Sequence, residues 1–177
     1  MLMEVFYHGS NTLFEHFDLS HALEGSGKVK FGYGVYVTSH YSSAVHYASV
    51  KNGSTDFYIY TVAVPELKED NYIAFKQGVH PDIIHRTEEK LKIVIPEEKK
   101  QDGKEFRKFL AKKLTGKADF TGEKAAADFL NSIGVECIVW PYNWKKPEAG
   151  TNRAIFNEEK IQILKVEQFK GESDNKE

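Results

Sequence analysis

Residues 31–39 read FGYGVYVTS, and a second segment, residues 7–10, reads YHGS. Both belong to apolar runs rich in β-branched and aromatic residues, a composition typical of strands. Each run sets one side chain, Tyr36 or His8, close to glycine. Because glycine lacks a Cβ, backbone and ligand can approach closely there. We therefore expect His8 and Tyr36 to line a binding cleft, and ordinary packing on a strand is the alternative for each.

Hydrophobic patterning predicts a mixed domain. Apolar runs indicate strands at residues 2–7, 57–64, 135–140 and 153–167. Apolar residues at helical spacing indicate helices at residues 41–51, 81–93, 104–114 and 123–133. Residues 94–104 carry Pro96 and Gly103 without periodicity, which favours a loop. Strands, then helices, then strands again are typical of an α+β fold.

Length and composition fit one compact domain. The chain has 177 residues, of which 41% are hydrophobic, and we expect the domain to span residues 1–170. The polar stretch 171–177 is expected to be a disordered tail. A net charge of -2 and a pI near 6.4 argue against a protein that holds nucleic acid mainly by its overall charge, and leave a local basic face open.

The sequence predicts neither a membrane segment nor a metal centre. The apolar run at the start is interrupted by Glu4 and is too short for a signal-peptide core or a membrane span. We therefore expect a cytoplasmic protein with no membrane partner. The pairs His40 and His46, and His80 and His85, have spacings that do not share a helix face, so no metal is expected.

Three blocks, in this order along the chain, resemble the ADP-ribosyltransferase superfamily in its diphtheria-toxin and poly(ADP-ribose) polymerase branch. They are His8-Gly9 after the first strand, Gly34 to Ser39 followed by Tyr47-Ala48, and residues 151–157, TNRAIFN. Residues 130–138, LNSIGVECI, are similar to a segment that precedes the last block in phage and bacterial members. The resemblance covers most of residues 2–167. It implies a split pair of mostly antiparallel sheets flanked by helices, and NAD as the substrate.

The resemblance also implies roles for single residues. His8 is expected to hydrogen-bond the adenine-side ribose of NAD, and the Gly9 backbone to pair with the nicotinamide amide. Tyr36 is expected to stack on the nicotinamide, and Tyr47 to cover the opposite face of that ring. For Tyr47, a core role on its helix is an equal alternative. The rest of the expected NAD-binding set is Ser10, Gly34 and Ser39.

The third block departs from the family pattern. Asn152 stands where many members carry the catalytic glutamate. An amide can hold a ribose by hydrogen bonds, but it carries no charge and cannot act as a base, so transfer of a single unit is expected rather than chain elongation. Glu148, four residues upstream, is the nearest carboxylate that can replace the glutamate. A glutamate on a surface loop is its other interpretation.

Together these features predict a NAD-dependent mono-ADP-ribosyltransferase, with His8, Tyr36 and Asn152 as catalytic residues. The expected acceptor is a macromolecule, either protein or nucleic acid, and a toxin or phage-associated effector role fits the members it resembles. The alternatives are a non-catalytic module that binds NAD or ADP-ribose, and a NAD glycohydrolase.

Three further features are not part of this predicted site. Trp140, Tyr142 and Trp144 precede two lysines and offer either stacking faces beside positive charge or the packing of an irregular loop. Residues 25–27, GSG, predict a flexible loop that lacks the lysine of a nucleotide-triphosphate loop. The single cysteine, Cys137, lies in an apolar run and is expected to be a buried structural thiol.

Overall fold

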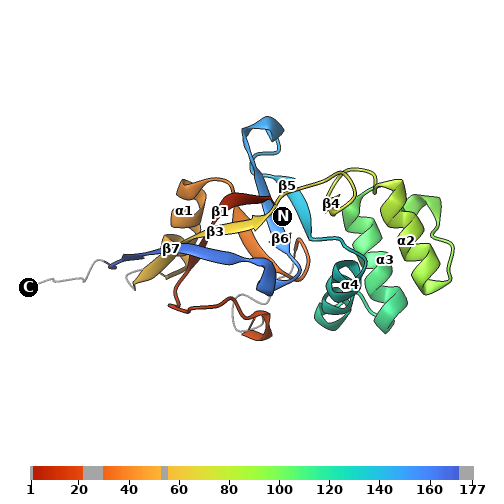
Figure 1. Ribbon diagram of the computed structural model, residues 1–177, viewed down its shortest axis with the longest axis horizontal. Coiled ribbons are helices and arrows are strands. Elements are labelled where there is room, and N and C mark those ends of the chain that lie inside the picture. Colours follow the sequence, from red (N-terminus) through yellow and green to blue (C-terminus); the bar gives the residue numbers. More distant parts are fainter. Residues whose placement is uncertain (1, 22–29, 53–55, 172–177) are drawn as a thin grey trace, which may run out of the picture.

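The computed structural model describes residues 2–21, 30–52 and 56–171. Within them, seven strands form a sheet in the order β4-β5-β6-β2-β1-β3-β7 (Figure 1). Neighbouring strands are antiparallel, except that β4 and β5 run parallel. The strands are β1 (Met3–Ser10), β2 (Val35–Thr38), β3 (Phe57–Pro65), β4 (Tyr72–Ala74), β5 (Cys137–Pro141), β6 (Thr151–Ile155) and β7 (Gln162–Phe169).

The sheet opens between β1 and β2. β1 pairs with β3 along its whole length, from Met3 opposite Pro65 onward. Among the described residues, β1 meets β2 at a single register pair, Tyr7 opposite Thr38, and we call this place the join. β2 pairs instead along its length with β6. The two parts of the sheet, β4-β5-β6-β2 and β1-β3-β7, therefore diverge on either side of the join.

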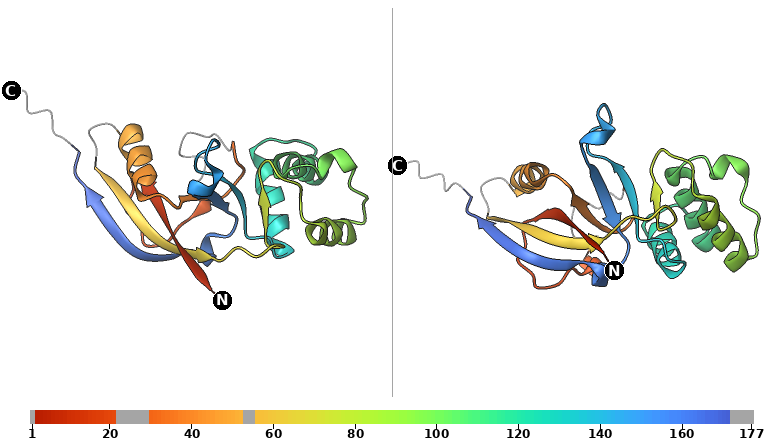
Figure 2. Two further views of the ribbon diagram at one scale, coloured as in Figure 1. Left: turned by 90° about the horizontal axis from the view of Figure 1, so that it is seen from above. Right: turned by 45° about the horizontal axis from the view of Figure 1, so that its top comes forward.

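Helices lie at both ends of the sheet (Figure 1, Figure 2). α1 (Tyr41–Asn52) packs on β1 and β3, whereas α2 (Pro81–Leu91), α3 (Gly103–Thr115) and α4 (Phe120–Ser132) gather at the β4 end. Aspartates set the starts of α3 and α4, because the Asp102 and Asp119 side chains accept hydrogen bonds from backbone N–H groups at 2.7 and 3.0 Å. α3 ends before Gly116, whose φ of 83° favours glycine.

One buried core connects the sheet to the helices at the β4 end. It includes Phe6 and Val62 on the strands, Phe106 and Leu110 on α3, and Leu130 on α4, each at most 4% exposed. Burying a large apolar side chain stabilises a fold by about 1.5–3 kcal/mol. The two parts of the sheet and these helices therefore share one hydrophobic interior.

The α+β class is confirmed, and the expected elements agree with the structure with three exceptions. The expected strand at residues 153–167 is two strands, because a 3-10 turn at Glu158–Lys160 separates β6 from β7. The sequence does not predict β4, because three residues are too few to show alternation. The strands follow one hydrogen-bonded order instead of two separate sheets. The GSG segment at residues 25–27 and tail residues 172–177 lie outside the described residues.

Two properties of the described elements bear on the sequence-based expectations. No described helix is both long enough and apolar enough to cross a bilayer. Cys137 is buried on β5, and this burial raises the pKa of its thiol to about 12. The expected buried thiol is confirmed, and its high pKa makes it inert at neutral pH.

Candidate functional site

His8 lies on β1, one residue beyond the join. Its Nδ1 lies 2.6 Å from the carbonyl oxygen of Tyr36, so Nδ1 carries a proton and donates it. The ring packs edge-on against Phe17, with 5.0 Å between ring centroids. Burial lowers the pKa of His8, and the bond to Tyr36 offsets part of this effect. His8 is therefore neutral at physiological pH, in the tautomer that leaves Nε2 as an acceptor.

Tyr36 uses its hydroxyl inside the protein. The hydroxyl donates to the carbonyl oxygen of Gly32 at 2.7 Å and accepts from the backbone N–H of Phe31 at 3.2 Å. These bonds close the turn that leads into β2. Burial raises the pKa of Tyr36 to about 12, so the phenol stays protonated. What Tyr36 can present to a ligand is its ring.

Four side chains form a row across one face of the sheet. Thr38 lies opposite Tyr7 on β1 and opposite Asn152 on β6, and Asn152 lies opposite Trp140 on β5. Directly opposite residues point to the same face, and Tyr36, two residues before Thr38, points there as well. The structure thus brings the ring of Tyr36 and the amide of Asn152 to one face.

The side chain of His8 points to the other face of β1. It follows Tyr7, and neighbouring side chains alternate along a strand. α1 lies on the Tyr7 side, where Tyr41 packs edge-on against Tyr7 at 5.4 Å between centroids. A ligand that contacts both His8 and the ring of Tyr36 must therefore cross the join.

Asn152 has a buried oxygen without a hydrogen bond. No described residue donates to its Oδ1. Buried polar groups are nearly always paired, and an unpaired one costs about 1–3 kcal/mol. Asn131, at the end of α4, also has such an oxygen, so the unpaired state alone does not mark a site. Asn152 differs in its position: it lies directly opposite Thr38, on the same face of the sheet as Tyr36.

Gly9 and Gly34 are expected from the sequence to leave room for a ligand, but the protein's own packing leaves no space for a Cβ at either position. A Cβ on Gly9 would come within 2.4 Å of the Ala44 carbonyl oxygen, and one on Gly34 within 2.7 Å of the Ile155 carbonyl oxygen. The space beside them is therefore filled by α1 and by β6. This finding corrects the physical reason for both glycines, while the backbone contact of Gly9 with nicotinamide stays a prediction.

The other predicted NAD-binding side chains come from the end of β1, the residue after β2, and α1. The hydroxyl of Ser10, at the end of β1, accepts from the Thr12 N–H at 3.1 Å. The hydroxyl of Ser39, just after β2, accepts from the Thr151 N–H at 3.0 Å. Each hydroxyl thus stabilises the local backbone and keeps its own proton to donate. Tyr47 lies on α1 and is 53% exposed, which rules out the core role considered for it.

Glu148 lies at the exposed tip of the β5–β6 hairpin. The tip contains the 3-10 turn η3 (Pro147–Ala149) and projects from the sheet as the light-blue loop in Figure 1. The hairpin is fastened to the segment after β2, because His40 Nε2 lies 2.7 Å from the carbonyl oxygen of Ala149. A Cβ on Gly150 would come within 2.7 Å of the same Nε2, so the contact is close. These positions favour the surface-loop interpretation of Glu148.

A buried ion pair, which the sequence does not predict, supports the turn before Tyr36. Arg107 on α3 and Glu123 on α4 are almost fully buried, and Arg107 Nε lies 2.7 Å from Glu123 Oε2 without the alignment of a hydrogen bond. Arg107 Nη2 donates to the carbonyl oxygen of Lys30 at 3.3 Å. Burial lowers the pKa of Arg107 and raises that of Glu123, and their attraction opposes both shifts. Charged residues on helices are usually solvated, so no pattern in the sequence distinguishes this pair.

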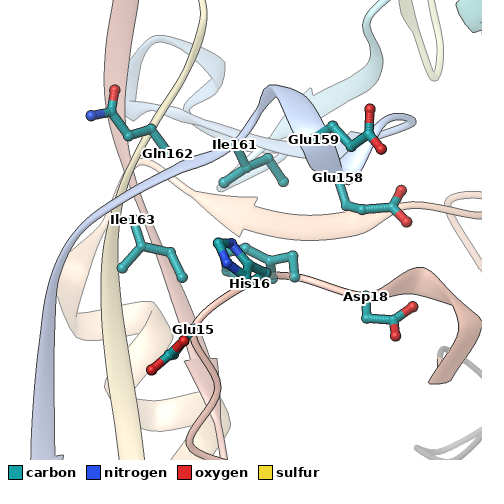
Figure 3. Close-up of a pocket in the computed structure, with 9 residues that line it drawn as sticks. Glu15, His16, Asp18, Glu158, Glu159, Ile161, Gln162 and Ile163 are labelled. Carbon is teal, nitrogen blue, oxygen red and sulfur yellow. The ribbon is translucent and has the colours of Figure 1, made fainter.

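A separate hollow, which we call the acidic pocket, has a volume of about 760 Å³ (Figure 3). It lies between the segment that follows β1 and the start of β7. Phe17, Ile161 and Ile163 are apolar residues that line it. Its carboxylates are Glu15, Asp18, Glu158 and Glu159. Like charges repel, so this lining disfavours a ligand that carries phosphates. Phe17 also contacts His8, so the pocket and the join are neighbours with different chemistry.

Comparison with protein-family models and curated proteins assigns no family or activity to this chain. No protein-family model matches the sequence, and neither does any curated protein. Within residues 2–21, 30–52 and 56–171, no three histidine, cysteine, aspartate or glutamate side chains come close enough to hold a metal ion. The candidate site is therefore the set His8, Tyr36 and Asn152 around the join.

Proposed function

We propose that this chain binds NAD across the join and transfers a single ADP-ribose unit to a macromolecular acceptor. The observation that carries the proposal is the buried, unpaired Oδ1 of Asn152 on the face that holds the Tyr36 ring. A ribose hydroxyl is a donor of the kind this oxygen lacks. The seven strands form one hydrogen-bonded sheet, but β1 and β2 share a single register pair at the join, and this near-division into two parts supports the split arrangement that the resemblance implies.

His8 supplies a second contact to a ribose. Its Nδ1 is held by the Tyr36 carbonyl, so its neutral Nε2 accepts a hydrogen bond from a hydroxyl. A dinucleotide has two riboses joined by a pyrophosphate, long enough to contact both faces at the join. We assign the adenine-side ribose to His8 and the nicotinamide-side ribose to Asn152.

Tyr36 supplies the aromatic contact. Its hydroxyl holds the turn from Phe31 to Gly32, which fixes the ring, and a flat ring binds a planar nicotinamide with little loss of side-chain entropy. Arg107 is a positioning residue for the same ring, because it holds the turn through Lys30.

The side chains on this face limit the reaction. Tyr7, Tyr36, Thr38, Asn152 and Trp140 carry no charge at neutral pH. The Asn152 carbonyl dipole can stabilise part of the positive charge that develops on the nicotinamide ribose when its glycosidic bond breaks. It cannot remove a proton from an acceptor, so the acceptor must be nucleophilic without a base from Asn152. This supports single transfer.

A binding module without catalysis is the second candidate. The exposure of Glu148 on η3 favours it, because that carboxylate is not held at the face of Asn152. NAD hydrolysis, with water in place of the acceptor, uses the same contacts.

Calorimetry with NAD, followed by measurement of nicotinamide release and mass spectrometry of modified macromolecules, separates these candidates. We expect binding, slow nicotinamide release and a mass increase on an acceptor. Binding without release would identify a module, and release without modification a glycohydrolase. Absence of NAD binding would refute the site.

Replacement of Asn152 by glutamate tests its place in the reaction. If Oδ1 faces the nicotinamide ribose, Asn152→Glu raises nicotinamide release by about tenfold for each 1.4 kcal/mol of added transition-state stabilisation. Asn131→Glu is the matched control, because Asn131 has a similar unpaired oxygen away from the join. An equal response of the two variants would contradict the assignment.

A further inference from the structure

We infer that the β5–β6 hairpin and the residues beside its base form a docking surface for single-stranded nucleic acid. The contacts of these residues support nucleic-acid binding on their own, whereas use of the surface to present an ADP-ribose acceptor rests on the proposed function.

Two aromatic side chains on the hairpin are exposed, and each packs against a second ring. Tyr142 and Trp144 are 40% and 46% exposed. The ring of His40 lies 4.0 Å from that of Tyr142, and the ring of Phe75 lies 6.1 Å from that of Trp144, centroid to centroid. Backing by a second ring limits rotation, so stacking a base on either residue costs little side-chain entropy.

A chain of ring contacts leads from this surface to the candidate site. Phe75 packs against Phe31 at 5.0 Å, and Phe31 stacks on Trp140 at 4.0 Å with nearly parallel planes. Trp140 in turn contacts the ring of Tyr36 at 5.5 Å. A strand of nucleic acid lying on Trp144 is thus connected, through packed rings, to the face where NAD is proposed to bind.

Lysines surround these rings. Lys76 Nζ lies 4.6 Å from the Trp144 ring centroid, Lys104 Nζ lies 5.7 Å from that of Phe75, and Lys30 Nζ lies 5.2 Å from that of Phe31. Such distances are typical of cation–π contacts. Of these rings Trp144 is exposed, whereas Phe75 is buried and Phe31 is half-buried. The three ammonium groups therefore lie close to a connected set of rings whose exposed member can stack on a base, and they can contact the phosphates beside that base.

The charge of the hairpin supports the same partner. Lys145 and Lys146 are exposed at its tip, with Glu148 as the acidic side chain beside them. Glu105, next to Lys104 in sequence, is paired with Lys99 at 3.5 Å. The net charge of the chain is only -2. In Figure 1 the hairpin projects at the top of the molecule, whereas the segment after β1, which contributes Glu15 and Asp18 to the acidic pocket, runs along the bottom. An anionic partner is therefore attracted to the hairpin side.

Nucleic acid fits this surface better than a protein does. Protein interfaces favour tyrosine and tryptophan but are depleted in lysine, whereas single-strand binding sites combine aromatic platforms with a basic surface. Duplexes bury the faces of their bases, so exposed rings such as Trp144 favour an unpaired strand.

Fluorescence anisotropy tests the inference with labelled oligothymidine and oligouridine of about 12 nucleotides, in about 50 mM salt and without NAD. We expect binding that weakens steeply with salt. Trp144→Ala should weaken it about tenfold, and Trp144→Phe should retain most of it, because stacking needs a ring. Lys76→Ala should weaken binding less and reduce its salt dependence.

Matched controls define the surface. Lys165→Ala on β7 removes an exposed lysine elsewhere, and Val94→Ala removes an exposed apolar side chain elsewhere, so both should bind like the unchanged protein. Absence of oligonucleotide binding, or equal losses for Lys165→Ala and Lys76→Ala, would overturn the inference. Equal affinity for a labelled polyglutamate would also overturn it, because that would show a general anion or protein surface. NAD calorimetry on the same samples tests the proposed function independently of these results.

Discussion

The join and the acidic pocket share the side chain of Phe17 but differ in charge. At the join the polar groups are uncharged: a neutral His8, the ring of Tyr36 and the unpaired amide oxygen of Asn152. The acidic pocket is a distinct hollow with four carboxylates in its lining. Volume alone favours the pocket as a ligand site, whereas charge disfavours a dinucleotide with two phosphates there. If NAD is the ligand, as proposed, the unpaired polar groups at the join are a better guide to its site than the size of a hollow.

Removing the ring of Tyr36 is the most severe test of this comparison. Tyr36→Ala should weaken NAD binding by tenfold to about a hundredfold, because base–aromatic stacking contributes about 1–3 kcal/mol. Ile163→Ala, which removes apolar contact from the acidic pocket, should leave the affinity within about twofold. Calorimetry, below the melting temperature of each variant, measures both. Equal losses of NAD affinity in Tyr36→Ala and Ile163→Ala would contradict the assignment of NAD to the join.

Removing the amide of Asn152 should have opposite effects on binding and folding. Asn152→Ala should weaken NAD binding about tenfold, the usual effect of losing a good hydrogen bond to a ligand. The free protein should melt at the same temperature or higher, because the variant no longer buries an unpaired oxygen. Calorimetry and thermal melting measure the two effects. A lower melting temperature with unchanged affinity would assign Asn152 to folding alone.

The sequence predicts the parts of this site better than their arrangement. Strand composition and the neighbouring glycines place His8 and Tyr36 on strands, because these signals depend on local backbone preferences. The single register pair at the join depends on how strands far apart in sequence diverge, which no local pattern encodes. The same holds for Gly9, whose neighbour Ala44 lies on a helix far along the chain. The bonds of the Tyr36 hydroxyl also require the folded turn, so the sequence does not predict them.

The protonation of His8 should make stability depend on pH. Its folded pKa lies below the ordinary 6.5, so below pH 6.5 the unfolded chain takes up the proton first. Stability from the neutral ring is therefore complete above pH 6.5 and falls as the pH falls towards the folded pKa. Between about pH 7.5 and 5.5 the melting temperature should therefore fall further in the unchanged protein than in His8→Gln. The difference should be about 2–4 °C for each kcal/mol of unfolding free energy that the neutral ring contributes.

The exposed His85 provides the control for this pH effect. Its side chain is 78% exposed beside Glu89, so His85→Gln should keep the pH dependence of the unchanged protein. As the pH is lowered, NAD affinity should also fall in the unchanged protein, because protonation of His8 Nε2 removes the hydrogen-bond acceptor for the ribose. A pH dependence that survives in His8→Gln would assign it to other groups.

Tyr36→Phe should separate the ring from the hydroxyl. NAD affinity should stay within about twofold, because the ring remains. The melting temperature should fall by about 2–8 °C, because the Phe31 N–H and the Gly32 carbonyl lose a partner worth about 1–2 kcal/mol. Tyr142→Phe, on an exposed hairpin residue, should leave the melting temperature unchanged. Loss of NAD affinity equal to that of Tyr36→Ala would mean that the ligand uses the hydroxyl.

The smallest expected effect belongs to the acidic pocket. Glu158→Gln removes one of its carboxylates without changing the shape of the side chain. If NAD binds at the join, this charge acts on it only through solvent and neighbouring atoms, and its effect should be less than about twofold even at low salt. If NAD bound in the pocket, removing a negative charge beside its phosphates would strengthen binding severalfold at low salt, and the gain would shrink as salt is added. Calorimetry of Glu158→Gln at two salt concentrations therefore decides between the two regions, even though the expected change is close to none.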